Sequence, residues 1–217
     1  MGVVILTGFS CTGKSTFVNT LQGDPALSHV QFVDTDQLIA ASAGGHIYDI
    51  FLNHVQGANR QAAEAFIENE ELKFLQTFQP AQHCIIAAGP ILPTRSPDFA
   101  NFLARTHATC VWLSISPVTA TQRLLNRQST LAANNPNVAS HAAFGSWNAP
   151  HLMEFDPLQG VYVQRSPANQ LASTSTILGN FENVYQHFGG GRPNRYFVEL
   201  APRRQAAEAR IRSIALR

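Results

Sequence analysis

The stretch that decides the fold lies near the N-terminus, where residues 3–15 read VVILTGFSCTGKS. Residues 3–6 are apolar and mostly β-branched, which predicts a buried strand of a parallel sheet. Residues 8–15 match the pattern GxxxxGK followed by Ser or Thr in full, and a helical pattern follows over residues 14–22. Strand, glycine-rich loop and helix in this order form the context of a phosphate-binding loop. The segment therefore predicts nucleoside triphosphate binding within an α/β fold.

The residue types of this phosphate loop, residues 8–15, suit phosphate chemistry. Its glycines let the backbone curl so that N–H groups converge on phosphate oxygens, and the following helix adds the positive end of its dipole. We expect Lys14 to bridge the terminal phosphates and the Ser15 hydroxyl to ligate Mg²⁺. The predicted nucleotide-binding residues are Gly8, Ser10, Cys11, Thr12, Gly13, Lys14, Ser15 and Thr16.

Beyond this segment, strands and helices are predicted to alternate as in a parallel sheet that is covered on both faces. Further strands are expected over residues 30–33, 84–88 and 109–114, and helices over 37–42, 47–54, 60–78, 96–105 and 117–128. Residues 129–195 are rich in Asn, Ser, Ala, Gly and Pro, and are expected to form an irregular lid or insertion within a single domain of residues 1–217. A surface insertion without catalytic importance is the alternative. The fifth strand lies either over 196–200, with a helix over 203–216, or over 173–178.

Composition excludes several classes of protein. The chain has 217 residues, 13% charged residues and a net charge of +1, which argues against binding driven by nucleic-acid phosphates. No apolar run is long enough to span a membrane, and residues 1–6 lack the basic start of a signal peptide. Cys11, Cys84 and Cys110 follow no disulfide or zinc pattern, which indicates a reducing cytoplasm. The oligomeric state is not indicated.

Two carboxylates follow the second predicted strand, at Asp34 and Asp36. In an open parallel sheet the carboxyl ends of the strands line the ligand crevice. Asp34 can therefore serve Mg²⁺ and Asp36 a substrate hydroxyl. Alternatively, the pair caps the next helix, and the two roles are compatible.

Residues 5–9, which lead into the phosphate loop, and residues 32–39 (FVDTDQLI) resemble the corresponding segments of shikimate kinases. The similarity continues through residues 45–51 (GHIYDIF), through Phe66 with Glu70, and through residues 111–116 with Arg123, and it weakens after about residue 128. The resemblance implies a three-layer P-loop kinase fold whose five-stranded parallel sheet has the order 2-3-1-4-5, with a mobile lid. It also implies ATP as the donor and Mg²⁺ as the cofactor.

The resemblance further implies roles for individual residues. Asp34 holds Mg²⁺ through water, Asp36 binds the acceptor hydroxyl and orients or deprotonates it, and Gly89 faces the substrate. Among the arginines it places Arg123 on the nucleotide side. Arg127, the arginine nearest to the missing lid motif, is expected to act in catalysis with Lys14 and Asp36. Arg165, followed by residues 166–167, resembles a second substrate-binding arginine, with an exposed loop arginine as the alternative. Arg203 follows a candidate fifth strand near the adenine base, with a solvated helix face as the alternative.

The sequence departs from the family where the acceptor binds. Ile67 stands at the position of an arginine that binds the acceptor, and an aliphatic side chain cannot make the bidentate bond that a carboxylate favours. Pro90 interrupts the family's triple glycine, and the lid motif is absent. We therefore expect an ATP- and Mg²⁺-dependent kinase that phosphorylates a hydroxyl of a shikimate-like or other small acceptor, which lacks the carboxylate or binds it otherwise. The alternative is a nucleotide-binding regulator without turnover.

Overall fold

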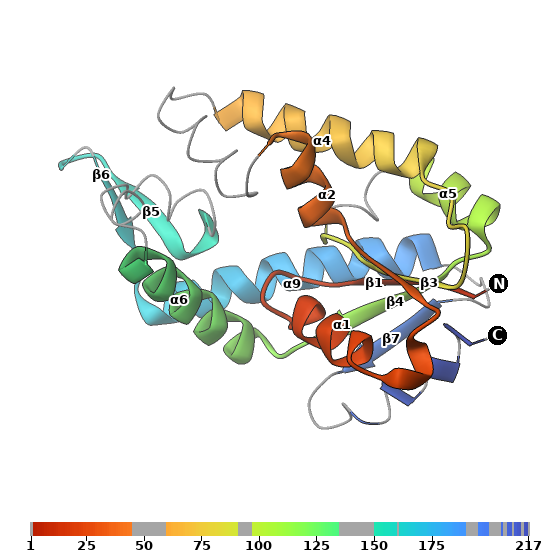
Figure 1. Cartoon of the computed structure of the whole chain (residues 1–217). Helices are drawn as coiled ribbons and strands as arrows, with labels where there is room; N and C mark the ends of the chain where they lie inside the picture. The colour runs from red at the N-terminus through yellow and green to blue at the C-terminus, as the bar shows by residue number, and fades with distance from the viewer. Residues whose placement is uncertain are drawn as a thin grey trace.

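A computed structural model of the chain describes residues 2–44, 60–90, 97–134, 150–159, 161–189 and 195–199, and parts of 205–216. Its centre is a five-stranded parallel sheet with the order β2-β3-β1-β4-β7 (Figure 1). The strands are β1 (Val3–Thr7), β2 (Gln31–Asp34), β3 (Cys84–Ala87), β4 (Thr109–Ser114) and β7 (Arg195–Glu199). The predicted order is confirmed, with the last strand within one residue of 196–200. The alternative over 173–178 is wrong because these residues lie in helix α9 (Pro167–Gly189).

The strands are buried on both faces because successive side chains point to opposite sides of the sheet. Val3 and Ile5 of β1 join one core cluster, whereas Val4 and Leu6 join another. Helices α4 (Arg60–Thr77), α5 (Asp98–Thr106) and α9 cover the first face, and α1 (Lys14–Gln22) covers the second, together with helical residues near the C-terminus. Figure 1 shows α4 and α5 on one side of the strands and α1 on the other. The result is the predicted three-layer arrangement.

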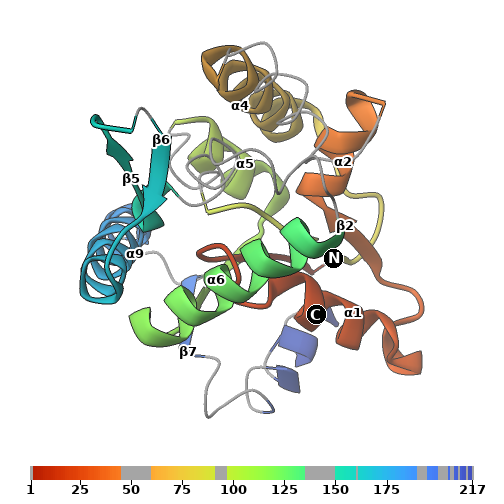
Figure 2. The same ribbon diagram turned by 90° about the vertical axis from the view of Figure 1, so that its left-hand side faces the viewer.

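The remaining described elements lie mainly around the carboxyl ends of the strands. They are η1 (Pro25–Leu27), α2 (Thr35–Ser42), α6 (Pro117–Asn134), η3 (Pro150–Leu152) and the antiparallel hairpin of β5 (Met153–Asp156) and β6 (Val161–Gln164). Figure 2 shows this hairpin standing out beside α9. The helix predicted to end near residue 128 runs on to Asn134, and the helix predicted over residues 47–54 lies outside the described residues.

The expectation of an irregular segment over residues 129–195 is wrong for its described part, which holds the end of α6, the hairpin and the 23 residues of α9. Helix α9 is rich in Ser, Thr and Asn, which have low helical propensity, so its local pattern resembles a loop. Tertiary packing stabilises it instead. The Tyr185 ring is buried against Trp112, and its hydroxyl donates to the carbonyl of Cys110 at 2.9 Å.

At the C-terminal end of helix α4, a side chain of α5 donates hydrogen bonds to the last carbonyl groups. The guanidinium of Arg105 donates to the backbone oxygens of Leu75, Gln76 and Phe78, at 2.9 to 3.1 Å. A cation at a helix C-terminus also interacts favourably with the helix dipole. This contact fixes α4 against α5, and so fixes the position of the acidic residues that α4 carries. No helix in the described ranges has the length and apolar character needed to cross a membrane.

Candidate active site

The phosphate loop adopts the tight curl that its sequence predicts. Gly8 has φ of +149°, and a Cβ atom there would lie 2.4 Å from the carbonyl oxygen of Leu113. Gly13, which precedes α1, has φ of +94°, and Cys11 between them has φ of +64°. Glycine is required at Gly8 by space and at Gly13 by conformation. The loop therefore bends around its own backbone N–H groups, in front of the N-terminus of α1.

The Lys14 side chain folds back onto the phosphate loop. Its ammonium donates to the carbonyl oxygens of Gly8 at 2.7 Å and Phe9 at 3.1 Å. Burial lowers the pKa of Lys14 to about 8, and the carboxylates of Asp36 and Asp34 act in the raising direction. Among the charges that raise this pKa, Asp36 has the largest effect. The structure thus brings both carboxylates from the end of β2 to the lysine of the loop.

Ser15 and Asp34 present oxygen atoms to each other. The Ser15 hydroxyl donates to Oδ2 of Asp34 at 3.4 Å. Oδ1 of Asp34 accepts from the backbone N–H of Asp36 at 3.0 Å and of Gln37 at 3.4 Å, so Asp34 caps α2 while its other oxygen faces the loop. A hydroxyl and a carboxylate are hard oxygen ligands of the kind that Mg²⁺ prefers. Ser15 and Asp34 therefore fit the Mg²⁺ ion that the resemblance implies. The predicted capping of α2 by Asp34 is confirmed as well.

Two arginines of α6 contact the phosphate loop at Cys11 and Thr12. Nη1 of Arg123 donates to the carbonyl oxygens of Cys11 at 3.1 Å and Thr12 at 3.2 Å. Nη1 of Arg127 lies 3.7 Å from the Cys11 sulfur, and its charge contributes to the lowered pKa of Lys14. Because Arg123 takes up the carbonyl groups of the loop, the opposite sides of these peptides remain available to phosphate. Arg203 lies outside the described residues.

Gly89 lies beside the loop at the carboxyl end of β3. Its carbonyl accepts the hydroxyl of Thr7 at 2.9 Å, and Thr7 directly precedes Gly8. A Cβ atom on Gly89 would lie 3.7 Å from Oε1 of Glu71, an α4 residue whose exposed fraction is 5%. Sequence reasoning missed Glu71. The available signal was its helical spacing, because positions 67, 71, 74 and 78 form one stripe in which 71 alone is charged.

Arg165 is tied to the hairpin. Its Nε donates to the carbonyl of Met153 at 2.9 Å, and its Nη1 lies 4.0 Å from a carboxylate oxygen of Glu154. Arg165 directly follows β6, and its side chain is 33% exposed. Burial, and next the charge of Arg165, lower the pKa of His151 to about 4. The His151 ring meets the Phe9 ring edge-on at 5.7 Å, which connects this region to the phosphate loop.

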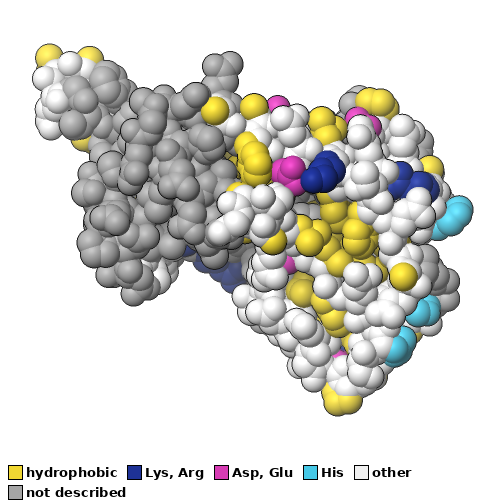
Figure 3. Space-filling model, turned by 45° about the horizontal axis from the view of Figure 1, so that its top comes forward, with side chains coloured by type: hydrophobic (Ala, Val, Ile, Leu, Met, Phe, Trp, Pro, Cys, Tyr) yellow, Lys and Arg dark blue, Asp and Glu magenta, His cyan; other side chains and the backbone are white. Residues whose placement is uncertain are grey.

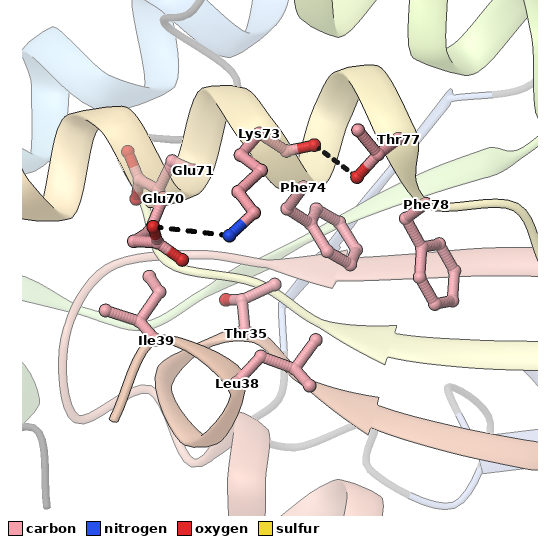
Figure 4. A pocket seen from close by; sticks show the side chains of 9 residues that line it. All are labelled: Thr35, Leu38, Ile39, Glu70, Glu71, Lys73, Phe74, Thr77 and Phe78. Atoms are coloured by element: carbon pink, nitrogen blue, oxygen red, sulfur yellow. Dashed lines mark hydrogen bonds and ion pairs between the residues drawn. The ribbon is translucent and has the colours of Figure 1, made fainter. Parts of the chain in front are cut away.

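A cavity of about 200 Å³ opens between α2 and α4. In Figure 4, Thr35 and Ile39 face α4 across the cavity, and Glu70 pairs with Lys73 at 3.7 Å. Figure 3 shows hydrophobic side chains gathered in a hollow on the side of the molecule that carries these helices. Glu71 lines the cavity as well, and Thr35 precedes Asp36 in the chain. The cavity therefore adjoins the carboxyl ends of β2 and β3.

Comparisons with known proteins agree with this geometry. The family model of shikimate kinase matches residues 10–153, which is more than half of the chain. A shikimate kinase of Rhodopirellula baltica is 28% identical over 180 residues, covering 82% of each chain. A shikimate kinase of Chlorobaculum tepidum is 27% identical over 135 residues, covering 62% of this chain and 64% of its own.

Solved structures share the fold. A shikimate kinase of Acinetobacter baumannii in complex with shikimate superposes with a TM-score of 0.62 at 18% identity, covering 100% of this chain and 93% of the other. A shikimate kinase of Bacteroides thetaiotaomicron gives 0.54 at 17% identity, covering 100% and 99%. The matched range contains Lys14, Asp34, Asp36 and Gly89. The chain therefore belongs to the shikimate kinase family of ATP-dependent phosphotransferases.

Proposed function

We propose that this chain transfers the γ-phosphoryl group of ATP to a hydroxyl group of a shikimate-like or other small hydroxylated acceptor, with Mg²⁺ as the cofactor. One observation carries the proposal: a complete phosphate loop, whose Lys14 binds the loop carbonyl groups, lies beside two carboxylates, Asp34 at Ser15 and Asp36, whose charge raises the pKa of Lys14. A general base or orienting group for an acceptor is needed at that place, within reach of the terminal phosphate.

The phosphate loop is built to hold a polyphosphate. The backbone N–H groups of residues 10–16 and the N-terminus of α1 offer donors and positive potential. The Lys14 ammonium can exchange the carbonyl groups of Gly8 and Phe9 for phosphate oxygens, which are stronger, charged acceptors. Arg123 keeps the curvature of the loop through its two carbonyl contacts.

Ser15 and Asp34 are the residues that would hold Mg²⁺, because their oxygens already face each other. When bound, the ion supplies positive charge that offsets the negative charge of the phosphates. The N–H groups of Asp36 and Gln37 keep the Asp34 carboxylate oriented toward Ser15. A fixed orientation of this kind lowers the cost of assembling the site when substrates bind.

Asp36 would accept a hydrogen bond from the acceptor hydroxyl and orient its oxygen toward the γ-phosphorus. The new O–P bond forms as the bond from the γ-phosphorus to the bridging β–γ oxygen breaks, ADP leaves, and the hydroxyl proton passes to Asp36 or to solvent. Lys14 and Arg127 stabilise the negative charge on the transferred group. Because Lys14 and Mg²⁺ favour an ionised carboxylate, Asp36 serves by its position more than by its basicity.

Further proposals concern the rest of the chain. We propose that residues 1–217 form one kinase domain and that residues 129–195 include its lid, which the contact between His151 and Phe9 supports. Arg165 is proposed to reach the acceptor and Arg203 the adenine base. The unpatterned cysteines support a cytoplasmic location.

The test is a screen of small hydroxylated compounds with purified protein, ATP and Mg²⁺, in which ADP and the phosphate ester are both detected. We expect ADP to form only when an acceptor is present, and the ester to appear in equal amount, as phosphorus NMR can measure. The Lys14→Met variant is the control and should form neither product. Nucleotide binding without acceptor-dependent ADP formation across the screen would contradict the proposal and favour the regulator.

A further inference from the structure

Thr7, the last residue of β1, joins the phosphate loop to the segment that follows β3. Its side chain is fully buried, and its hydroxyl donates to the carbonyl of Gly89 at 2.9 Å. Thr7 directly precedes Gly8, where the phosphate loop begins, and Gly89 lies just beyond the end of β3. A side-chain hydrogen bond therefore connects the loop that holds the donor to the residue that the family resemblance places at the acceptor.

This hydrogen bond continues the connection between β1 and β3 at the point where the phosphate loop begins. The Ala88 N–H donates to the Leu6 carbonyl at 2.8 Å, as expected between parallel strands. The chain then leaves the strand at Gly8, which has φ of +149°. Here the Thr7 hydroxyl, rather than a backbone N–H, donates to the neighbouring chain. A β-branched side chain has few χ1 rotamers, so a buried threonine keeps its hydroxyl in one direction.

The peptide between Gly89 and Pro90 depends on this contact for its orientation. Packing leaves room at Gly89, because the nearest atom to an added Cβ, Oε1 of Glu71, would lie at an ordinary contact distance of 3.7 Å. Proline has no N–H to donate. The carbonyl oxygen is therefore the one hydrogen-bonding group of this peptide, and Thr7 donates to it.

We propose that Thr7 is a positioning residue for phosphoryl transfer: it fixes the Gly89 peptide relative to the phosphate loop, and so sets the distance of the acceptor from the γ-phosphate. The inference rests on the proposed function and adds a residue to the same site. Transfer between two bound molecules depends on the separation and alignment of the reacting atoms, and small displacements are costly. Because Thr7 is fully buried, it acts through Gly89 and not by touching a substrate.

The test compares variants of Thr7, with shikimate as the first acceptor and, if shikimate is not phosphorylated, the best acceptor of the proposed screen. Thr7→Val replaces the hydroxyl by a methyl group of similar size. We expect kcat/KM for the acceptor to fall by about tenfold, whereas the Kd for ATP stays within about twofold of the wild type. Thr7→Ser keeps the hydroxyl and should restore most of the lost kcat/KM.

Thr106→Val is the matched control. Thr106 is also buried, and its hydroxyl also donates to a backbone carbonyl, that of Phe102, at 2.7 Å. It is the last residue of α5 and leads into the start of β4, at the opposite end of the parallel sheet from the phosphate loop. Both valine variants should lower Tm by about 2–4 °C, since each loses one buried hydrogen bond. Thr106→Val should nevertheless leave kcat/KM for the acceptor and the Kd for ATP unchanged.

Each result supports or overturns the role of Thr7. Wild-type kcat/KM in Thr7→Val overturns the inference and leaves the proposed function intact. Equal losses of acceptor turnover and ATP affinity also overturn it, because the whole phosphate loop is then disturbed. If Thr7→Val is too unstable to measure, Thr7→Ser and Thr7→Ala provide the comparison, since they differ only in the hydroxyl, and similar kcat/KM values for the two overturn the inference. Absence of turnover by the wild type with every acceptor, while ATP binds, overturns the proposed function and the inference together.

Discussion

Gly8 carries the tightest steric constraint in the phosphate loop. Its φ of +149° is one that side chains rarely adopt, and the nearest atom to an added Cβ would be a backbone oxygen 2.4 Å away, which cannot rotate aside. The end of β1 and the end of β4 therefore approach each other only because this residue has no side chain. This contact sets where the loop begins to curl.

Gly8→Ala should lower the free energy of unfolding by about 2–4 kcal/mol, because both the backbone conformation and the contact with Leu113 must change. Gly44→Ala is the matched control, since Gly44 has φ of +73° but no atom within 4 Å of an added Cβ. It should cost only about 1 kcal/mol. Urea denaturation measures both variants, and equal losses would show that the contact with Leu113 has no energetic weight.

Single residues also mark the limit of what the sequence could predict about the site. The loop motif and the two aspartates could be predicted because short-range spacing places them at strand ends. Glu71 and His151 could not, because their roles come from contacts with Gly89 and Phe9, which are distant in the chain. Arg165 was placed in an irregular loop, since nothing local shows that its Nε binds the backbone of β5.

At the scale of elements, α9 is the main correction to the sequence prediction. Its Ser- and Thr-rich sequence resembles a loop, whereas Leu178 and Tyr185 are buried in two core clusters. The four strands with apolar runs were predicted well because a strand buried on both faces has a local signature. A helix that is stabilised by one packed face has a weaker signature, particularly when its other positions carry small polar residues.

Tyr185→Phe tests whether α9 belongs to the core. The change removes one buried hydrogen bond, to the carbonyl of Cys110, and should lower the free energy of unfolding by about 1–2 kcal/mol. Thr176→Ala on an exposed position of the same helix is the control and should change stability by less than about 0.5 kcal/mol. Thermal or urea unfolding of both variants gives the comparison. If the Tyr185→Phe protein is as stable as the control variant, the hydrogen bond from Tyr185 to Cys110 does not stabilise the packing of α9.

The burial of His151, which lowers its pKa, predicts a pH dependence of stability. The pKa of His151 is lowered from 6.5 to about 4, so the unfolded chain binds a proton more readily than the folded protein between these values. The stability that this group contributes is present above pH 6.5 and is lost as the pH falls toward 4. His151→Phe keeps the ring beside Phe9 and should flatten this part of the stability profile. His29→Gln, at an exposed position, should leave the profile as in the wild type, and an unchanged slope in His151→Phe would contradict the account.

At the scale of the whole molecule, the strand order brings the chemistry together. Because β1 lies between β3 and β4 in the sheet, the phosphate loop is flanked by Gly89 on one side and by Arg123 of α6 on the other. The order of the strands could be predicted from the resemblance to a family, whereas the alternation of strands and helices alone predicted only a parallel sheet. The identity of the acceptor could not be predicted, because it depends on how distant side chains border one cavity.

The two functions that the sequence left open differ in what Asp36 does. A kinase needs this carboxylate for transfer to the acceptor, whereas a nucleotide-binding regulator needs only the phosphate loop. Removing the charge of Asp36 without changing its size therefore separates them. The variant keeps the cap of α2, because Asp34 supplies that contact.

The most direct measurement is acceptor-dependent ADP formation by Asp36→Asn at saturating ATP and Mg²⁺, with the Kd for ATP determined on the same preparation. We expect kcat to fall by about 100-fold or more, as for loss of an orienting or general-base carboxylate, while the Kd for ATP stays within about twofold of the wild type. Wild-type turnover in this variant would contradict the central claim that the carboxylate at the end of β2 receives the acceptor hydroxyl.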